Sequence, residues 1–186
     1  MKTIKVLLSE HALIRQYVDN LTIAMEKMEA GFPPPREFFN LMLDFSRTFI
    51  DRVHHFKEEY LLFERLAERM NGKVDQYVVQ LRREHESGRE YLSRINAALD
   101  GYDEGRQAQT QEVYENLKAF TIQLRHHIHT EDHLFFPMVE QMLTAADGAE
   151  MDGLFKAELV KNGGEEFIER SREKVQQMGL ILASLA

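Results

Sequence analysis

The chain has 186 residues, 44% of them hydrophobic and 29% charged, which is typical of one globular domain with a sizeable core. Its net charge is −8 at pH 7 without a Lys/Arg cluster, so we expect no nucleic-acid partner, and no apolar run is long enough to span a membrane. The absence of cysteine excludes disulfides, thiolate metal sites, cysteine nucleophiles and iron–sulfur clusters, and it fits a cytoplasmic protein.

Apolar residues recur at steps of three and four along most of the chain, which is the spacing of one helix face. The pattern predicts four long helices, at residues 3–30, 36–70, 73–100 and 106–143. Turn-forming residues separate them at 31–35, 71–72 and 101–105. No segment alternates with period two, so we expect an all-α fold without strands.

Short loops between long helices favour an antiparallel up-down four-helix bundle over residues 1–145. Residues 146–186 have a helical pattern again, with a break expected at 162–164. We expect them to form an additional C-terminal helical extension, packed on the bundle or used for association, as in a homodimer.

The helix predicted at residues 106–143 has an apolar face that is interrupted in its middle. At helical spacing this face carries Val113, Leu117, Phe120, Leu124, His127, Glu131, Leu134 and Met138. Burying an imidazole and a carboxylate without partners costs several kcal/mol, so His127 and Glu131 must pair with other groups or bind a ligand.

Histidines interrupt the other helices in a pattern that repeats. His11 stands alone in the first apolar stripe and His85 in the third, while the second and fourth helices carry a His followed four residues later by Glu, at His54/Glu58 and His127/Glu131. The first His precedes the second by 43 residues in one half and 42 in the other. A single inward histidine is more often a hydrogen-bonded core residue. Matched spacing in two halves instead indicates a duplicated helical hairpin with a shared site.

The second helix leaves two ligand pairs open. Periodicity alone favours His55/Glu59, which lies at the edge of the broad aromatic face, whereas alignment of the two halves favours His54/Glu58. We take His54 and Glu58 as the predicted ligands and expect the other pair beside them, orienting a ligand. The remaining histidines of the fourth helix, His126, His129 and His133, are expected to point toward solvent or to lie beside the ligands.

A His and a Glu four residues apart on a helix lie on one face, and four such faces that meet in a bundle can surround one or two cations. Four imidazoles and two carboxylates are too many for one tetrahedral zinc ion, and they suit two ions with open positions. Iron is the predicted metal, with another divalent metal as the alternative.

These motifs resemble those of the hemerythrin-like (HHE cation-binding) family. The similarity covers about residues 4–143 and rests on His11, the run HHFKEEYLLF at 54–63, Glu84-His85, and LRHHIHTEDHLFFPM at 124–138. The resemblance implies an up-down four-helix bundle that holds two non-haem iron ions with an oxo or hydroxo bridge. It further implies that the terminal ligands are His11, His54, His85 and His127, and that Glu58 and Glu131 bridge the irons.

The chain departs from the oxygen-carrying members in its third helix, where Arg89 replaces a second histidine, and this implies a more open centre. Asp132, five residues after His127, matches the carriers, but Glu131 fits the HHE pattern better. The expected function is binding of oxygen or a related small ligand (nitric oxide, peroxide) at an open iron position, in sensing, storage or stress response. A di-iron oxidoreductase acting on peroxide or nitric oxide and a metal-free helical interaction module are the alternatives.

Overall fold

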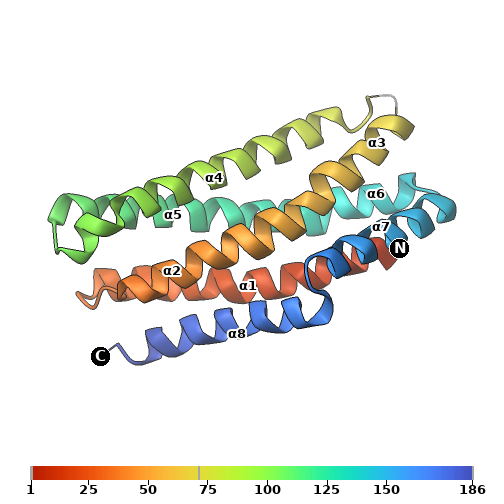
Figure 1. Ribbon diagram of the computed structural model, residues 1–186. Coiled ribbons are helices and arrows are strands. Elements are labelled where there is room, and N and C mark those ends of the chain that lie inside the picture. Colours follow the sequence, from red (N-terminus) through yellow and green to blue (C-terminus); the bar gives the residue numbers. More distant parts are fainter. Residues whose placement is uncertain (1, 71, 186) are drawn as a thin grey trace.

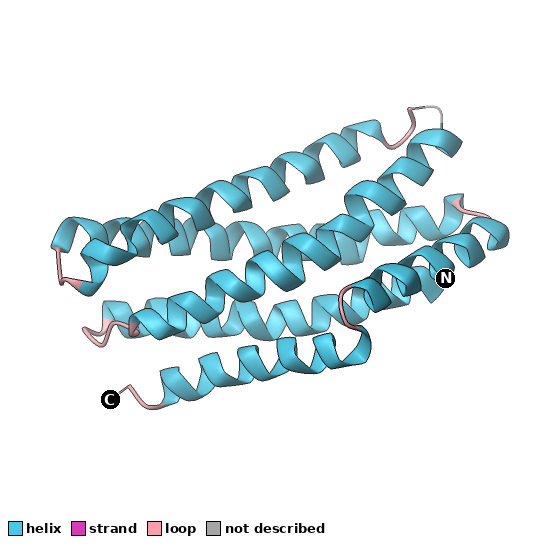
Figure 2. Ribbon diagram, in the orientation of Figure 1, coloured by secondary structure: helices cyan, strands magenta, loops and turns pink. Residues whose placement is uncertain are grey.

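The computed structural model describes residues 2–70 and 72–185, and all regular secondary structure within them is helical (Figure 2). The helices are α1 (Lys2–Glu29), α2 (Arg36–Phe45), η1 (Ser46–His55), η2 (Lys57–Leu62), α3 (Phe63–Met70), α4 (Asp75–Asp103), α5 (Gln107–Thr130), η3 (Glu131–Phe135), α6 (Phe136–Met142), α7 (Ala145–Lys161) and α8 (Gly164–Ala183). The predicted all-α class is confirmed. Asn71, half of one predicted turn, lies outside the described residues.

Four long helical rods lie side by side, and each turns back along the one before it (Figure 1). The first is α1, and the third is α4. The second is continuous from α2 through η1 and η2 to α3, and the fourth from α5 through η3 to α6. These rods correspond to the four predicted helices.

Within the second and fourth rods, the α-helix gives way to π-helical turns at η1, η2 and η3. A π-turn hydrogen-bonds from residue i to i+5, so it holds about one more residue than an α-turn and shifts the inward face along the chain. This shift makes part of the predicted stripes wrong. Leu134 is 60% exposed, and Phe135 takes its inward place.

The apolar core is divided into two clusters along the bundle. One cluster includes Ile14, Phe49 and Leu117, and the other includes Leu7 and Phe135. His11 lies on α1 between Leu7 and Ile14, at the level where the two clusters meet. The buried histidines at this level and the acids around them therefore form a polar layer between two apolar regions, which keep water away from it.

The C-terminal helices α7 and α8 pack along the bundle and share its core (Figure 1). Phe155 of α7 joins the cluster around Leu7, and Met178 of α8 joins the cluster around Ile14. The Asn20 side-chain amide of α1 also donates a hydrogen bond of 2.8 Å to the backbone oxygen of Val175. No helix among the described residues combines the length and the apolarity needed to cross a membrane.

Candidate metal centre

The six predicted ligands converge in the polar layer from four rods. They are His11 on α1, His54 on η1, Glu58 on η2, His85 on α4, His127 on α5 and Glu131 on η3. None of these six residues is more than 2% exposed. The structure thus brings together all six side chains that the duplicated pattern singled out.

Side-chain atoms that could bind a metal form two groups here, and within each group these atoms all lie within 4.8 Å of one another. The first group is His11, His54, Glu58 and Glu131, and the second is His55, Glu58, His85 and His127. Glu58 belongs to both groups.

The two carboxylates connect the groups. One oxygen of Glu58 lies 3.5 Å from His54 Nε2, and its other oxygen lies 3.6 Å from His85 Nε2. Oε2 of Glu131 lies 3.3 Å from His11 Nε2 and 3.2 Å from His127 Nε2. The geometry therefore describes two adjacent positions with two shared carboxylates.

His55 is the member that the sequence interpretation placed outside the ligand set. It lies in the second group, and it is 8% exposed. In an α-helix, neighbouring residues point about 100° apart, so His54 and His55 would not both face the site. The π-turns of η1 and η2 bring both inward, and Glu58 and Glu59 are buried with them. The helical periodicity that favoured His55/Glu59 in the sequence was the feature that indicated an inward His55.

Each of the four predicted histidine ligands has a carboxylate on its outer nitrogen. The Nδ1–H groups of His11, His54, His85 and His127 donate to Asp132 at 2.6 Å, Glu10 at 3.0 Å, Glu59 at 2.7 Å and Glu84 at 2.7 Å, respectively. His55 Nδ1 lies 3.6 Å from Asp51. A proton held at Nδ1 leaves the lone pair of Nε2 facing inward, which is the tautomer that binds a metal ion.

The inward-facing nitrogens and oxygens of these side chains do not satisfy one another. His11 Nε2 lies 2.9 Å from His54 Nε2, and His85 Nε2 lies 3.0 Å from His127 Nε2, so lone pairs face one another unless one nitrogen is protonated. Among the described residues, no hydrogen bond is formed to either oxygen of Glu58 or Glu131, although two imidazole nitrogens lie 3.2 and 3.3 Å from Glu131 Oε2. Buried acceptors without donors are costly, and cations between them would satisfy them all.

Protons on His11, His127 and Glu58 take the place of cations when these side chains are alone. Burial by itself would lower the pKa of His127, but Glu131 and Glu84 outweigh it and raise this pKa to about 9. The pKa of His11 is raised in the same way, against burial, by Asp132 and Glu131. Burial and the nearby Glu131 raise the pKa of Glu58 well above its usual value. A metal ion bound here would therefore displace protons.

The duplication extends to the outer carboxylates. Glu10 precedes His11 as Glu84 precedes His85, and each accepts from the histidine of the following rod. Glu59 likewise corresponds to Asp132, because each follows a shared carboxylate directly. Glu59 was expected beside the ligands, but Glu10, Glu84 and Asp132 were missed as supporting groups of the site, although their matched places in the two halves were a readable signal.

Arginines extend the repeat one step further outward. Arg15 of α1 pairs with Asp132 at 2.5 Å, and Arg89 of α4 pairs with Glu59 at 2.8 Å. Each arginine follows the candidate ligand of its helix by four residues. Arg89 therefore supports the acid that holds His85, in the place where the oxygen carriers have a histidine.

The other histidines and Tyr17 lie apart from the centre. His126, His129 and His133 are exposed. The prediction had allowed either solvent or a place beside the ligands. Tyr17 is buried and its hydroxyl lies 2.6 Å from Ser46 Oγ, so it packs between helices instead of touching a candidate ligand.

Comparison with known proteins also indicates a metal-binding helical protein. The sequence profile described as hemerythrin HHE cation-binding domain matches residues 2–139. Curated relatives include uncharacterized proteins of Mycobacterium tuberculosis and Mycobacterium bovis, each 23% identical over 169 residues, which is 91% of this chain and 66% of the relative. The chain thus spans just under two thirds of their length, and no solved structure gives a significant match. With three quarters of its length matched by the profile, the chain belongs to the hemerythrin HHE cation-binding domain family.

Proposed function

We propose that this chain is a non-haem di-iron protein of the hemerythrin type, which binds oxygen or a related small ligand such as nitric oxide or peroxide at an open iron position. Its role would lie in sensing, storage or stress response. The observation that carries the proposal is the set of inward acceptors without donors, which divides into two groups that share Glu58.

The donor set fits two ions. His11 and His54 would hold one, and His55, His85 and His127 the other, with Glu58 and Glu131 shared. Five imidazoles and two carboxylates exceed the needs of one tetrahedral zinc ion, and imidazole with carboxylate suits iron or manganese. Two six-coordinate ions would still have positions left for a small ligand.

Bound iron would supply one-electron chemistry and an open position for a ligand, and the protein supplies orientation and a dry surrounding. The outer carboxylates fix the histidine tautomers and make the inward nitrogens more basic, so that they bind a metal ion more strongly. Aromatic rings cover the layer from one side, because Phe136 stacks on His11 at 5.4 Å between ring centroids, and Phe63 stacks on His85 at 6.4 Å. Fewer water molecules then compete for the open position.

The geometry favours this function over its two alternatives. A metal-free interaction module needs its buried polar groups to satisfy one another, and the oxygens of Glu58 and Glu131 form no hydrogen bond among the described residues. An oxidoreductase needs a free proton donor at the open position. Near the second group, the hydroxyl of Ser46 is already bonded to Tyr17, and Arg89 is bonded to acids.

The test is metal analysis of the chain produced with iron in the medium, followed by an optical spectrum after exposure to oxygen. We expect about two irons per chain and a near-ultraviolet charge-transfer band of ferric iron. A colourless chain without iron would contradict the proposal. Rapid turnover of peroxide by the iron-loaded chain would favour the oxidoreductase.

A further inference from the structure

Two adjoining spaces lead from the surface toward the second ligand group. A cleft of about 230 Å³ lies between the second rod and α4, and a smaller cavity of about 30 Å³ lies against His55, His85 and His127. Four residues line both spaces, namely Ser46, Asp51, Arg89 and Leu92. The cleft and the cavity therefore meet at these side chains.

The two spaces differ in how much water they hold. One water molecule needs about 10–15 Å³ of such space, so the cleft has room for a metal ion with about six bound water molecules. The cavity has room for about two water molecules. An ion that moves inward must therefore lose water where the cleft meets the cavity, and this loss costs least where protein ligands replace the water.

The chain offers two metal-binding side chains at this boundary. Asp51, whose side chain is 41% exposed, places an oxygen 3.6 Å from Nδ1 of His55. Nδ1 of His55 has no hydrogen-bond partner among the described residues, whereas the other four histidines of the centre are each bonded to an acid there. Carboxylate and imidazole together suit first-row transition-metal ions. His55 is also a member of the second ligand group, so the boundary lies next to an ion position.

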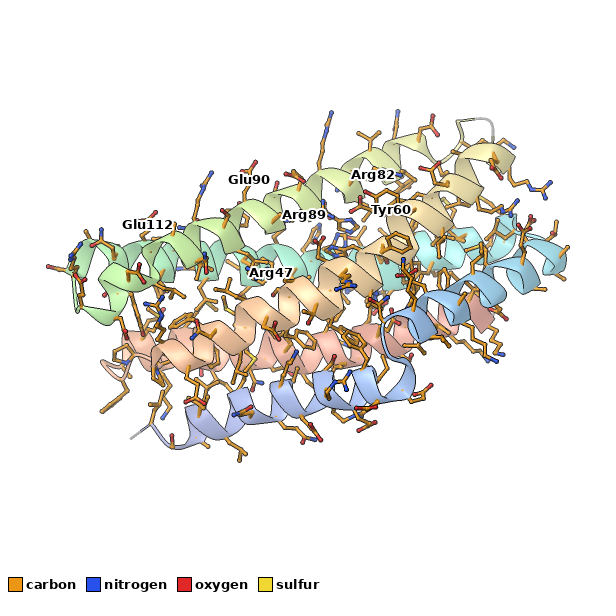
Figure 3. All side chains as sticks on the ribbon, in the orientation of Figure 1. Arg47, Tyr60, Arg82, Arg89, Glu90 and Glu112 are labelled. Carbon is orange, nitrogen blue, oxygen red and sulfur yellow. The ribbon has the colours of Figure 1, made fainter. Side chains whose placement is uncertain are left out.

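The guanidinium of Arg89 occupies the place of a cation at this boundary. It donates to Asp51 at 2.8 Å, to Glu59 at 2.8 Å and to Glu86 at 3.2 Å. Figure 3 shows Arg89 on α4, next to the rod of residues 36–70 that supplies Asp51 and Glu59. Three carboxylates around one guanidinium leave a net negative charge, which attracts a divalent cation. Glu86 lies on the exposed side of α4, so Arg89 keeps a partner there when it leaves Asp51.

The other half of the bundle lacks this arrangement. The residue equivalent to Asp51 is Leu124, and the residue equivalent to His55 is Ile128. The pocket beside Ile128 is lined by none of the residues in the two ligand groups. A carboxylate, an imidazole and an inward space thus coincide on one half only.

We propose that Asp51 and His55 form the entry site at which the chain takes up its metal ions, and that Arg89 closes this site by pairing with Asp51. The ligand class is a divalent first-row transition-metal ion. An incoming ion replaces the guanidinium at Asp51, while Arg89 stays bonded to Glu86. The inference rests on the proposed function, because it supplies the route by which the metal centre is filled.

The test compares the rate of ferrous iron uptake by the metal-free chain, without oxygen, with the rate of iron loss to a chelator. A residue on the route changes the barrier, so it changes both rates by the same factor and leaves the affinity unchanged. Arg89→Gln removes the competing charge, and we expect both rates to rise at least tenfold. Asp51→Asn removes the carboxylate that replaces the lost water, and we expect both rates to fall at least tenfold. Each variant should still bind two ions per chain.

Arg47→Gln is the matched control. Arg47 lines the same cleft from the second rod and has no ion pair among the described residues (Figure 3). Both rates in this variant should stay within threefold of the wild type. The opposite signs expected for Arg89→Gln and Asp51→Asn guard against a loosened fold, which would speed iron loss in both variants.

Three results would overturn the entry site. Faster loss with unchanged uptake in Arg89→Gln would mean that Arg89 only supports Glu59 and, through it, His85. Unchanged uptake in Asp51→Asn would mean that ions enter elsewhere, and faster rates in both variants would mean a loosened fold. Failure of the proposed function looks different, because the wild type itself would then take up no iron.

Discussion

Glu58 connects the two groups of candidate ligands, since its oxygens face different histidines and neither has a hydrogen-bond partner among the described residues. Glu58→Ala should therefore reduce bound iron from two ions per chain to fewer than one, whereas His54→Ala should remove about one. Metal analysis of the purified variants measures this. Glu64→Ala, on the exposed face of the same rod, should keep both ions. Two ions in Glu58→Ala would show that Glu58 is not shared.

Neighbouring histidines on α5 test which face is inward. His127 is buried and close to Glu131, while His126 is exposed. His127→Ala should lower both iron content and the unfolding temperature, because a metal bound only to the folded chain stabilises it by about 2.7 kcal/mol at a hundred times its Kd. His126→Ala should change neither. Equal losses in the two variants would mean that the facing of α5 is different.

At the scale of single residues, the sequence predicted which six side chains come together, because they interrupt apolar stripes and recur in both halves. Of the carboxylates behind the histidines, only Glu59 was expected beside a ligand. Glu10 and Glu84 have matched places in the two halves, but they lie in a chain with 31 acidic residues, and their spacing along one helix does not show that each meets a histidine of the next rod. Contacts between rods depend on how the rods are rotated, which a stripe specifies only roughly.

At the scale of elements, the π-turns explain both errors of the periodic prediction. A period of 3.6 residues carries the expected face from Glu131 to Leu134, whereas η3 carries it to Phe135. The same change in the second rod lets His54 and His55 both enter the layer. The choice between two histidine pairs was thus posed on the assumption of a regular α-helix.

The start of α7 gives a pH-dependent prediction. Asp147 accepts hydrogen bonds from the hydroxyl of Thr144 at 2.6 Å and from its backbone at 3.1 Å, and it pairs with Arg69 at 2.9 Å, all of which lower its pKa. A folded pKa below the unfolded value, about 3.9 for Asp, means that its stabilising effect is present above this pH and is lost as the pH falls through the folded pKa.

Asp147→Asn should therefore unfold at a lower temperature than the wild type at pH 7, and the difference should shrink below about pH 4. Thermal unfolding of both chains without metal, across this pH range, measures the effect and keeps the ligand histidines out of the comparison. Asp103→Asn, at an exposed position, is the control. A difference that persists unchanged at low pH would show that the charge of Asp147 does not matter.

At the scale of the whole molecule, two apolar clusters enclose a polar layer, and α7 and α8 add side chains to both clusters. The all-α class and the four rods follow from helical periodicity and short loops. How the C-terminal helices pack did not follow, because an amphipathic stripe such as that of Val175, Met178 and Leu182 shows that a partner exists without showing which one. The packing places Phe155 over the end cluster around Leu7.

The most direct test of the central claim, that two cations hold these buried imidazoles and carboxylates together, is titration of the metal-free chain with ferrous iron. Thermal stability and bound metal are followed together. We expect binding to saturate at two ions per chain, with an unfolding temperature that rises through both equivalents and falls again in chelator. An unfolding temperature that ignores both iron and chelator, with no bound metal, would contradict the account.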